Sequence, residues 1–412
     1  MQDSQVAQLV GDVDRAASSA REHIAMQAFH ARFPSSYYVT PPTSPPSRPL
    51  APPTQRRYFY LDVKPPEGVP TKATILFLHG FPDSSYGWRS VLSPISLSGF
   101  RCIVPDLLGY GRSSAPNKET RLAEYGAHAI ALDLKGLMET VLGNTEDKFA
   151  VVGHDWGSWL AWKLATWIPE KLLGVHGIAA AYAAPSSRYL STNEIVKTFP
   201  HFGYQVFFDD PRSTDIIGKH IWRFLHLIFI APSLLLQQSS DDVRSVFNID
   251  MTTLGSLEKF LVSSGSSKTS LDELLERTSL IKTAEDRAVF ERLFDPQRGG
   301  ASIDGALNWY RTRKVNFDED RERPQKMLPA MPYKILCPTA DPTSPVSTTE
   351  KTAKHYPKET PLVIQEMPMA GHWAMLEGPD QVVQSVLSWM NNDVLPYREK
   401  TSTWSGWARS KL

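Results

Sequence analysis

Short apolar runs alternate with longer helical patterns through most of the chain, beginning near Arg56. Seven runs rich in β-branched and aromatic residues predict strands at 56–63, 73–79, 101–106, 148–154, 172–180, 333–338 and 361–367. Helix-length segments such as 122–142 and 157–168 lie between several of them. Most runs do not alternate strictly between apolar and polar residues, which is typical of strands buried on both faces of a parallel sheet. The pattern predicts a doubly wound α/β fold, with a mostly parallel sheet and helices on both faces.

The alternation stops near Ala184 and resumes near Met331. The intervening residues, 185–330, show helical patterns broken by prolines and by the serine-rich stretch 263–267. A helical block that leaves an α/β sheet at a strand end lies over the carboxyl edge, where such sheets bind ligands. We therefore expect a helical lid inserted into a core whose two parts are 55–184 and 331–395.

The two ends of the chain differ from this core. Seven prolines lie between Pro41 and Pro53, a composition that favours extended polyproline structure and cannot build a core, so residues 1–54 are predicted to be an N-terminal extension. Residues 1–30 contain no continuous apolar stretch, which disfavours a secretory signal. The predicted C-terminal tail, 396–412, ends in Ser410, Lys411 and Leu412, a tripeptide that an import receptor reads as a peroxisomal address. We expect a peroxisomal protein that is otherwise cytoplasmic.

Composition excludes several classes of partner. The chain has 44 Lys+Arg and 44 Asp+Glu without a basic cluster, so nothing favours a nucleic acid. Cys102 and Cys337 lie in apolar runs, which indicates buried thiols and neither a disulfide framework nor a metal site. The longest apolar run, 221–236, is interrupted by Arg223 and Pro232 and is too short for stable membrane insertion. The neutral charge balance suits an uncharged, apolar substrate.

The stretch Gly153-His154-Asp155-Trp156-Gly157 joins the predicted strand 148–154 to a helical segment. It has the spacing of a nucleophile elbow, where small flanking residues permit a sharp strand-to-helix turn, but Asp155 replaces the usual serine. A carboxylate that attacks an acyl carbon would form an anhydride. Attack on a saturated carbon with a leaving group gives an ester that water can cleave. Asp155 therefore predicts an epoxide or an alkyl halide as the substrate.

An acid and a base follow in the chain order of this fold. Asp341 comes after the predicted strand 333–338, and His372 comes after the last strand. The order Asp155, Asp341, His372 predicts a nucleophile, an acid and a base. His372 would activate water against the ester, while Asp341 fixes its tautomer and stabilises the imidazolium.

The stretch His79-Gly80-Phe81-Pro82 follows a predicted strand, where an elbow fold draws its second oxyanion N–H group. We expect the backbone N–H groups of Phe81 and Trp156 to hold the oxyanion formed when the ester is hydrolysed. Phe81, Pro82 and Trp156 are also predicted to contact the substrate.

Together these motifs resemble the epoxide hydrolases of the α/β-hydrolase superfamily. The resemblance covers about residues 56–395 and is carried by HGFPDSSYGWRS, CIVPDLLGYGRSSAP, VGHDWGSWLAW, GYQVFFDDP, LNWYR and GHWAMLEGPD. It implies an α/β-hydrolase fold without a cofactor and a lid with two tyrosines whose hydroxyls bind and protonate the epoxide oxygen. These match Tyr204 in GYQVFF and Tyr310 in NWYR. The chain departs from the family pattern in the loop around the predicted acid, CPTADPTSP, because Pro342 directly follows Asp341.

Other functions stay open at this point. A dehalogenase would use the same nucleophile, acid and base, but resemblance to haloalkane dehalogenases would imply a halide-binding amide where Phe81 stands, and a fluoroacetate-type enzyme would carry Arg in place of Trp156. An isomerase, a cyclase or a binding protein could also reuse the pocket, although binding alone needs no complete catalytic set. We expect an enzyme that opens a small apolar epoxide with water. The tryptophans near the elbow favour a hydrophobic epoxide, and a peroxisomal address would suit one derived from a fatty acid.

Overall fold

The computed structural model describes residues 29, 31–247, 249, 251, 253–263, 269–323 and 327–401. Residues 1–28 and residue 30 of the predicted N-terminal extension, and the tail from Ser402 onward, lie outside these residues. The predicted targeting tripeptide, Ser410 to Leu412, lies outside them as well, so the localisation stays a prediction.

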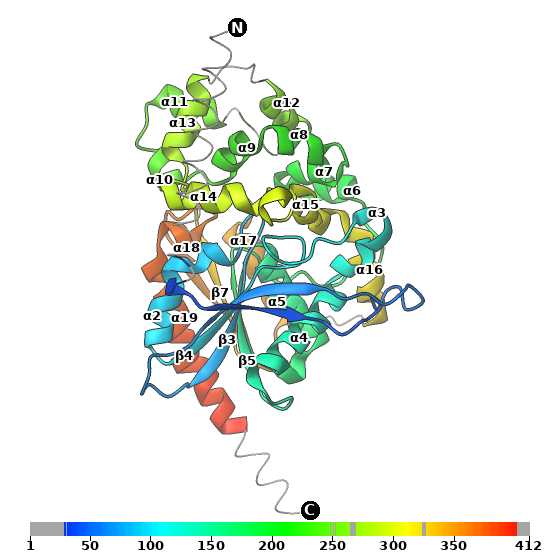
Figure 1. Ribbon diagram of the computed structural model, residues 1–412. Helices are drawn as coiled ribbons and strands as arrows, with labels where there is room; N and C mark the ends of the chain where they lie inside the picture. The colour runs from blue at the N-terminus through cyan, green and yellow to red at the C-terminus, as the bar shows by residue number, and fades with distance from the viewer. Residues whose placement is uncertain are drawn as a thin grey trace, which may run out of the picture.

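A single sheet of eight strands forms the centre of the molecule, in the order β1-β2-β4-β3-β5-β6-β7-β8 (Figure 1). β1 and β2 are antiparallel to their neighbours, and the other strands are parallel to one another. The seven predicted strands are all present and end within two residues of the predicted limits: β2 (Arg57–Val63), β3 (Ala73–Leu78), β4 (Phe100–Pro105), β5 (Phe149–His154), β6 (Leu172–Ile178), β7 (Tyr333–Pro338) and β8 (Leu362–Met367). The predicted α/β class is confirmed.

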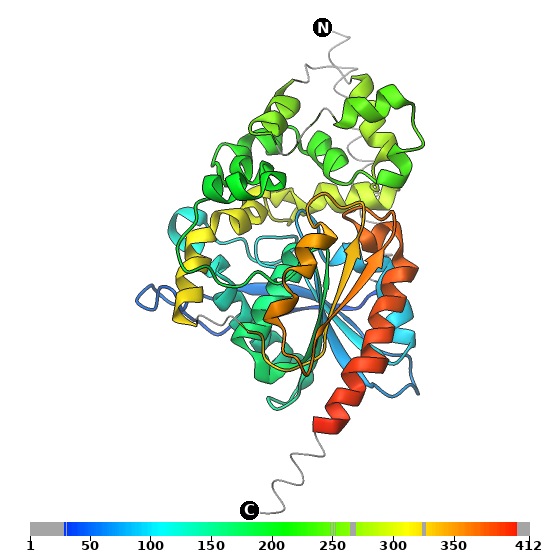
Figure 2. The same ribbon diagram turned by 180° about the vertical axis from the view of Figure 1, so that it is seen from behind.

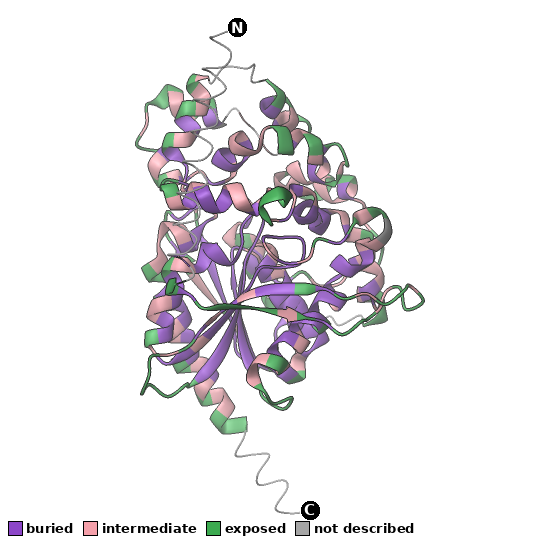
Figure 3. Ribbon diagram, viewed as in Figure 1, coloured by how far each residue is buried: buried purple, intermediate pink, exposed green. Residues whose placement is uncertain are grey.

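Helices cover both faces of the sheet. α2 (Arg89–Leu97) and α19 (Pro379–Trp389) lie on one face, and α4 (Ala127–Leu142) and α5 (Trp156–Trp167) lie on the other (Figures 1 and 2). Every residue of β3, β5, β6 and β7 is buried, which explains why these runs do not alternate (Figure 3). The shorter core elements are η1 (Ser85–Trp88), α3 (Lys118–Arg121), η2 (Leu122–Tyr125), η3 (Pro169–Lys171), α17 (Val346–Glu350), η6 (Ala353–His355), α18 (Ala374–Glu377) and η7 (Met390–Val394).

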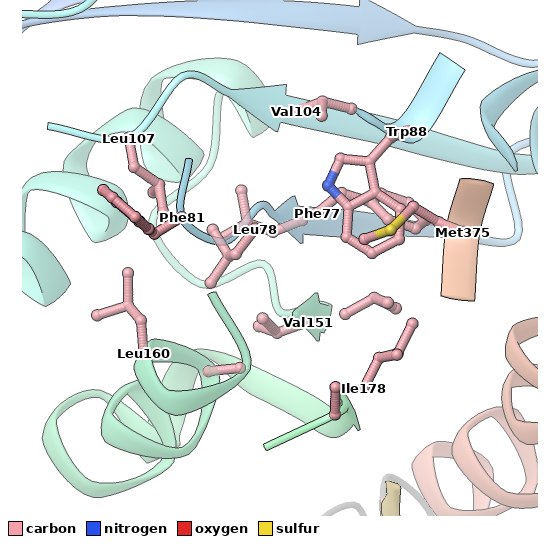
Figure 4. Close-up of a cluster of buried hydrophobic side chains, with 14 of the residues drawn as sticks. Phe77, Leu78, Phe81, Trp88, Val104, Leu107, Val151, Leu160, Ile178 and Met375 are labelled. Atoms are coloured by element: carbon pink, nitrogen blue, oxygen red, sulfur yellow. The ribbon is translucent and has the colours of Figure 1, made fainter. Parts of the chain in front are cut away.

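The core beside β3 shows how the apolar runs are used. Side chains of Phe77 and Leu78 on β3 lie among Val104, Val151 and Ile178 of the neighbouring strands and Leu160 of α5, with Trp88 and Met375 at one side (Figure 4). All of these side chains are buried. The two thiols, of Cys102 and Cys337, are also buried and free, as predicted. No helix in the described part of the chain is long and apolar enough to cross a bilayer.

One strand was not expected from the sequence. β1 (Ser35–Val39) pairs with β2, Thr43 bridges to Thr54, and the side chain of Phe33 is fully buried. The expectation that residues 1–54 form a proline-rich extension without a core is therefore wrong for the segment from Phe33 to Thr54. Pro34 directly precedes the strand, the run of seven prolines begins only at Pro41 after the strand has ended, and an edge strand tolerates prolines next to it.

The predicted helical insertion is present between β6 and β7, and it lies above the sheet in Figure 1. Figure 2 shows the orange strands β7 and β8 running toward it. Its elements are α6 (Thr192–Thr198), η4 (Pro200–Phe202), α7 (Tyr204–Asp209), α8 (Ser213–Lys219), α9 (Ile221–Ile228), α10 (Pro232–Leu235), α11 (Ser240–Phe247), α12 (Ser256–Val262), α13 (Ser270–Thr278), α14 (Ala284–Leu293), η5 (Pro296–Arg298), α15 (Ile303–Arg311) and α16 (Arg313–Glu322). We call this region the lid.

Specific polar contacts fix the lid to the core. The indole N–H of Trp309 on α15 donates to the carbonyl of Leu108 at 2.8 Å. Glu319 on α16 accepts the backbone N–H of His128 at 2.9 Å, at the first turn of α4, where a carboxylate is favourable. α15 also approaches the backbone of the core closely, because a Cβ on Gly305 would lie 2.5 Å from the carbonyl oxygen of Gly109. The position of α15 relative to the sheet is thus set by backbone contact.

The elbow requires a similarly close approach at the start of α5. A Cβ on Gly157 would lie 2.2 Å from the carbonyl oxygen of Leu78 on β3. We expect Gly157→Ala to lower the free energy of unfolding by about 1–3 kcal/mol, because backbone must move to accommodate the methyl group. Gly218 on α8 is the matched control: a Cβ there meets nothing within 4 Å, so Gly218→Ala should be neutral or stabilising by up to about 1 kcal/mol. Urea unfolding measures both, and equal effects of the two substitutions would contradict this packing.

Candidate active site

Asp155 stands at the turn between β5 and α5 with φ 52° and ψ −118°. Positive φ is strained for a residue with a side chain and costs on the order of 1–3 kcal/mol. Gly153 and Gly157 allow this turn, because a Cβ on Gly153 would lie 2.2 Å from the carbonyl oxygen of Gly157. The sharp turn predicted from the sequence is therefore formed, with Asp155 at its apex.

The two carboxylate oxygens of Asp155 have different environments. Oδ1 accepts the backbone N–H of Phe81 at 2.9 Å, and the backbone N–H of Trp156 also favours the charged carboxylate. Oδ2 lies 3.8 Å from Nε2 of His372. Burial raises the pKa of Asp155, although the charge of His372 and the two N–H groups lower it in part. One oxygen is thus held by N–H groups, while the other faces the imidazole.

His372 and Asp341 form a closely hydrogen-bonded pair. Nδ1 of His372 lies 2.8 Å from Oδ2 of Asp341, whose side chain is fully buried. Burial lowers the pKa of His372, but the carboxylates of Asp341 and Asp155 outweigh this effect and raise the pKa to about 9. Burial also works against the charge of Asp341, yet His372 and Thr343 hold the pKa of Asp341 below its usual value. The pair is an imidazolium and a carboxylate at neutral pH.

The loop around Asp341 has a geometry that suits this pairing despite its additional proline. Oδ1 of Asp341 accepts both the backbone N–H of Thr343 at 2.8 Å and its hydroxyl at 2.7 Å. These bonds leave Oδ2 for His372. Sequence reasoning did not single out Thr343, although a threonine two residues after an aspartate is a recognisable turn signal.

Two more residues hold the backbone around His372. His154, directly before Asp155, donates from Nε2 to the carbonyl of His372 at 2.8 Å. Glu377 accepts the backbone N–H of Gly371 at 3.1 Å. Neither residue was selected from the sequence, because a lone histidine or glutamate carries no signal until the fold brings distant segments together.

The lid brings Tyr204, at the start of α7, and Tyr310, on α15, toward Asp155. The ring centroid of Tyr310 lies 5.0 Å from that of Phe81 and 5.1 Å from that of Trp156, and the two tyrosine rings are 6.3 Å apart. Burial, with a contribution from the charge of Asp155, raises the pKa of both phenols, so they stay neutral. Neighbouring side chains oppose this rise in part: Trp156 lowers the pKa of Tyr310, and Gln205 lowers the pKa of Tyr204.

The structure therefore brings seven of the predicted site residues together: Asp155, Phe81, Trp156, His372 and Asp341 from the core, and Tyr204 and Tyr310 from the lid. Pro82 is buried directly after Phe81. In the described part of the chain no group of three or more His, Cys, Asp or Glu side chains is arranged to hold a metal ion.

The sheet order, the strained turn at Asp155 and the helical lid inserted after β6 are the features of the α/β-hydrolase fold. A family model of the α/β hydrolase fold matches residues 73–218. Epoxide hydrolase srdG of Neurospora crassa is 28% identical over 345 residues, which are 80% of this chain and 91% of that protein. Bifunctional epoxide hydrolase 2 of Sus scrofa is 26% identical over 322 residues, 77% of this chain, and the chain spans about half (51%) of that protein.

Among solved structures, epoxide hydrolase A from Mycobacterium thermoresistibile matches with a TM-score of 0.62 and 20% identity, covering 87% of this chain and 98% of that one. At this identity the likeness supports the fold alone. The chain thus has the α/β-hydrolase fold, and over most of its length it is distantly similar to epoxide hydrolases.

The raised pKa of His372 gives a direct test of this arrangement. In Asp155→Asn the carboxylate charge is lost, so we expect the pKa of His372 to fall from about 9 toward its usual value. Titration of the imidazole signals by NMR measures it, with His372→Gln used to assign the signal among the 11 histidines. Lys314→Gln, a substitution at an exposed pair with Asp318, is the control and should leave the pKa unchanged. An unchanged pKa in Asp155→Asn would contradict the coupling.

Proposed function

We propose that the protein is an epoxide hydrolase that converts a hydrophobic epoxide to a vicinal diol through a covalent ester on Asp155. The observation that carries the proposal is the place of Tyr310, whose ring contacts both Phe81 and Trp156. A neutral phenol thus packs against the two residues whose N–H groups face Asp155, close enough for the charge of Asp155 to raise its pKa. This combination suits a reaction in which a carboxylate attacks carbon while an oxygen leaving group must be protonated.

In the first step, Oδ2 of Asp155 attacks an epoxide carbon, and the ring C–O bond breaks. The departing oxygen is held by the hydroxyls of Tyr204 and Tyr310 and takes a proton from one of them. Their raised pKa values keep both phenols protonated before the reaction, so both can donate. The products of this step are a hydroxyalkyl ester on Asp155 and a phenolate.

In the second step, His372 removes a proton from water, and the resulting hydroxide attacks Cγ of Asp155. Oδ1 becomes the oxyanion and is already held by the N–H group of Phe81. Collapse releases the second diol oxygen, which takes the proton from His372. The proton left on the Asp155 carboxyl group is lost to solvent, and solvent returns one to the phenolate.

Ester formation also prepares His372 for this second role. The charge of Asp155 contributes to the raised pKa of His372, and this charge disappears when the ester forms. The pKa of His372 therefore falls, and the imidazolium releases its proton to solvent before the neutral imidazole acts as a base; His372 takes a proton back from solvent once the Asp155 carboxylate is restored. Asp341 keeps its charge and stabilises the imidazolium that forms when water is deprotonated.

The walls of the site favour an apolar substrate. Phe81 packs against Phe208 and Phe224 with ring centroids 5.2 and 6.1 Å apart, and Trp156 packs against Trp159 at 5.1 Å. A halide would be the leaving group in the alternative, a dehalogenase with the same nucleophile. Two neutral hydroxyl donors support an oxygen leaving group, because an alkoxide needs a proton on departure and a halide does not.

Product analysis separates these two functions. Incubation with a panel of lipid, aryl and small polar epoxides should give diols, fastest with the apolar members, whereas chloroalkanes and fluoroacetate should release no halide. Halide release without diol formation would overturn the proposal in favour of a dehalogenase. Faster turnover of small polar epoxides would remove the hydrophobic substrate class.

The intermediate can be trapped by removing the base. In His372→Gln the ester should form but hydrolyse slowly, so mass spectrometry of the peptide containing Asp155 should show an increase equal to the mass of the epoxide. Asp155→Asn should show no adduct under the same conditions. If His372→Gln turns over epoxide at the wild-type rate without an adduct, the ester mechanism is wrong.

A further inference from the structure

The loop that carries His372 is bound to the lid through the next residue, Trp373. Its side chain is fully buried, and its indole N–H donates to the carbonyl of Ile228, the last residue of α9, at 2.7 Å. The indole also stacks on Phe229, with ring centroids 4.0 Å apart and ring planes 14° from parallel. Both contacts reach the segment that joins α9 to α10, residues 228–232, which we call the lid corner.

The lid corner also lies against the residue before His372. A Cβ on Gly371 would lie 2.5 Å from Cδ of Pro232, the first residue of α10, so Pro232 closely approaches the backbone of the loop. In Figure 1 the short helix α18, which follows Trp373, accordingly lies below α10. The lid corner thus contacts the residues on both sides of His372.

The lid corner has a fixed place within the lid. The ring of Phe229 packs edge-on against Phe290 of α14, with centroids 4.8 Å apart. The carbonyl of Phe229 accepts the backbone N–H of Leu280, which follows α13, at 2.8 Å. The corner therefore moves with these lid helices, and a change in the position of the lid would be transmitted to the loop of His372.

The two steps of the proposed reaction place different demands on this loop. In the first step Asp155 attacks carbon and the lid tyrosines hold the oxygen, so His372 transfers no proton. In the second step Nε2 of His372 must take a proton from a water that attacks Cγ of Asp155. The bond from Nδ1 to Asp341 orients the ring, but the place of the ring also depends on the backbone that carries it. A displacement of about 1 Å can slow such a step by a factor of ten to a hundred.

We propose that Trp373 is a positioning residue that couples the lid to His372 and so supports ester hydrolysis. The lid would then serve both steps, with its tyrosines in ester formation and with its corner in ester hydrolysis. This inference rests on the proposed epoxide hydrolase function.

The test separates the two steps in Trp373→Phe, which keeps a ring that can stack on Phe229 but removes the indole N–H. We expect ester formation at the wild-type rate and ester hydrolysis about tenfold slower. Rapid quenching followed by mass spectrometry of the peptide containing Asp155 measures both rates in a single turnover. In the steady state kcat and KM should fall together, while kcat/KM, which reports ester formation, stays within about twofold of the wild type.

A second variant changes the same contact from the lid side. Phe229→Leu keeps an apolar side chain but loses the stacking on Trp373, so it should also slow ester hydrolysis without slowing ester formation. Trp162→Phe is the matched control: its buried indole N–H donates to the carbonyl of Ala180 at 2.8 Å, within the core. Both rates should stay at the wild-type value in this control.

Unchanged ester hydrolysis in Trp373→Phe would overturn the inference. Equal slowing of both steps would overturn it as well, because a general loss of structure produces that result. If Trp373→Phe does not fold, Phe229→Leu decides by the same two criteria. The proposed function fails separately, if epoxide forms no ester on Asp155 in the wild type or in His372→Gln.

Discussion

The geometry of the candidate site depends on one strained turn. Asp155 adopts a positive φ of 52° between β5 and α5, and its Oδ1 is tied to the N–H of Phe81 at the end of β3. Two neighbouring parallel strands thereby meet at one carboxylate. Gly157 permits the contact, because any side chain there would enter the backbone of β3. The packing of the central sheet compensates for the strain and for the buried charge at the apex.

This turn places the charge of Asp155 in a buried position, and the other charged residues of the site interact with it. Asp155 and Asp341 lie on opposite sides of His372, and together they raise its pKa to about 9. The imidazolium in turn favours ionisation of both carboxylates. Asp155, His372 and Asp341 are all charged, and ester formation would remove the charge of Asp155. The interaction between Asp155 and His372 would therefore link nucleophilic attack to base catalysis. The lid contributes neutral donors, which suits an oxygen leaving group.

Local patterns were enough to predict the sheet and the elbow, because buried strands and glycine-flanked turns leave signals within a few residues. The predicted strands appear within two residues of their limits, and Asp155, Asp341 and His372 meet in space as their chain order implied. β1 was missed because neighbouring prolines dominate the composition of its segment. Thr343 and Glu377 were missed for a different reason: their roles come from loop contacts with Asp341 and Gly371, whose geometry no helix or strand period encodes.

The central claim is that the carboxylate of Asp155 is the nucleophile, and a single turnover in water labelled with heavy oxygen tests it most directly. With enzyme in excess over epoxide, the diol should contain no label, because its new oxygen comes from Asp155, and the label should appear in the carboxyl group of Asp155. A diol that carries the label in the first turnover, with Asp155 unlabelled, would show that water attacks the epoxide directly and would contradict the account.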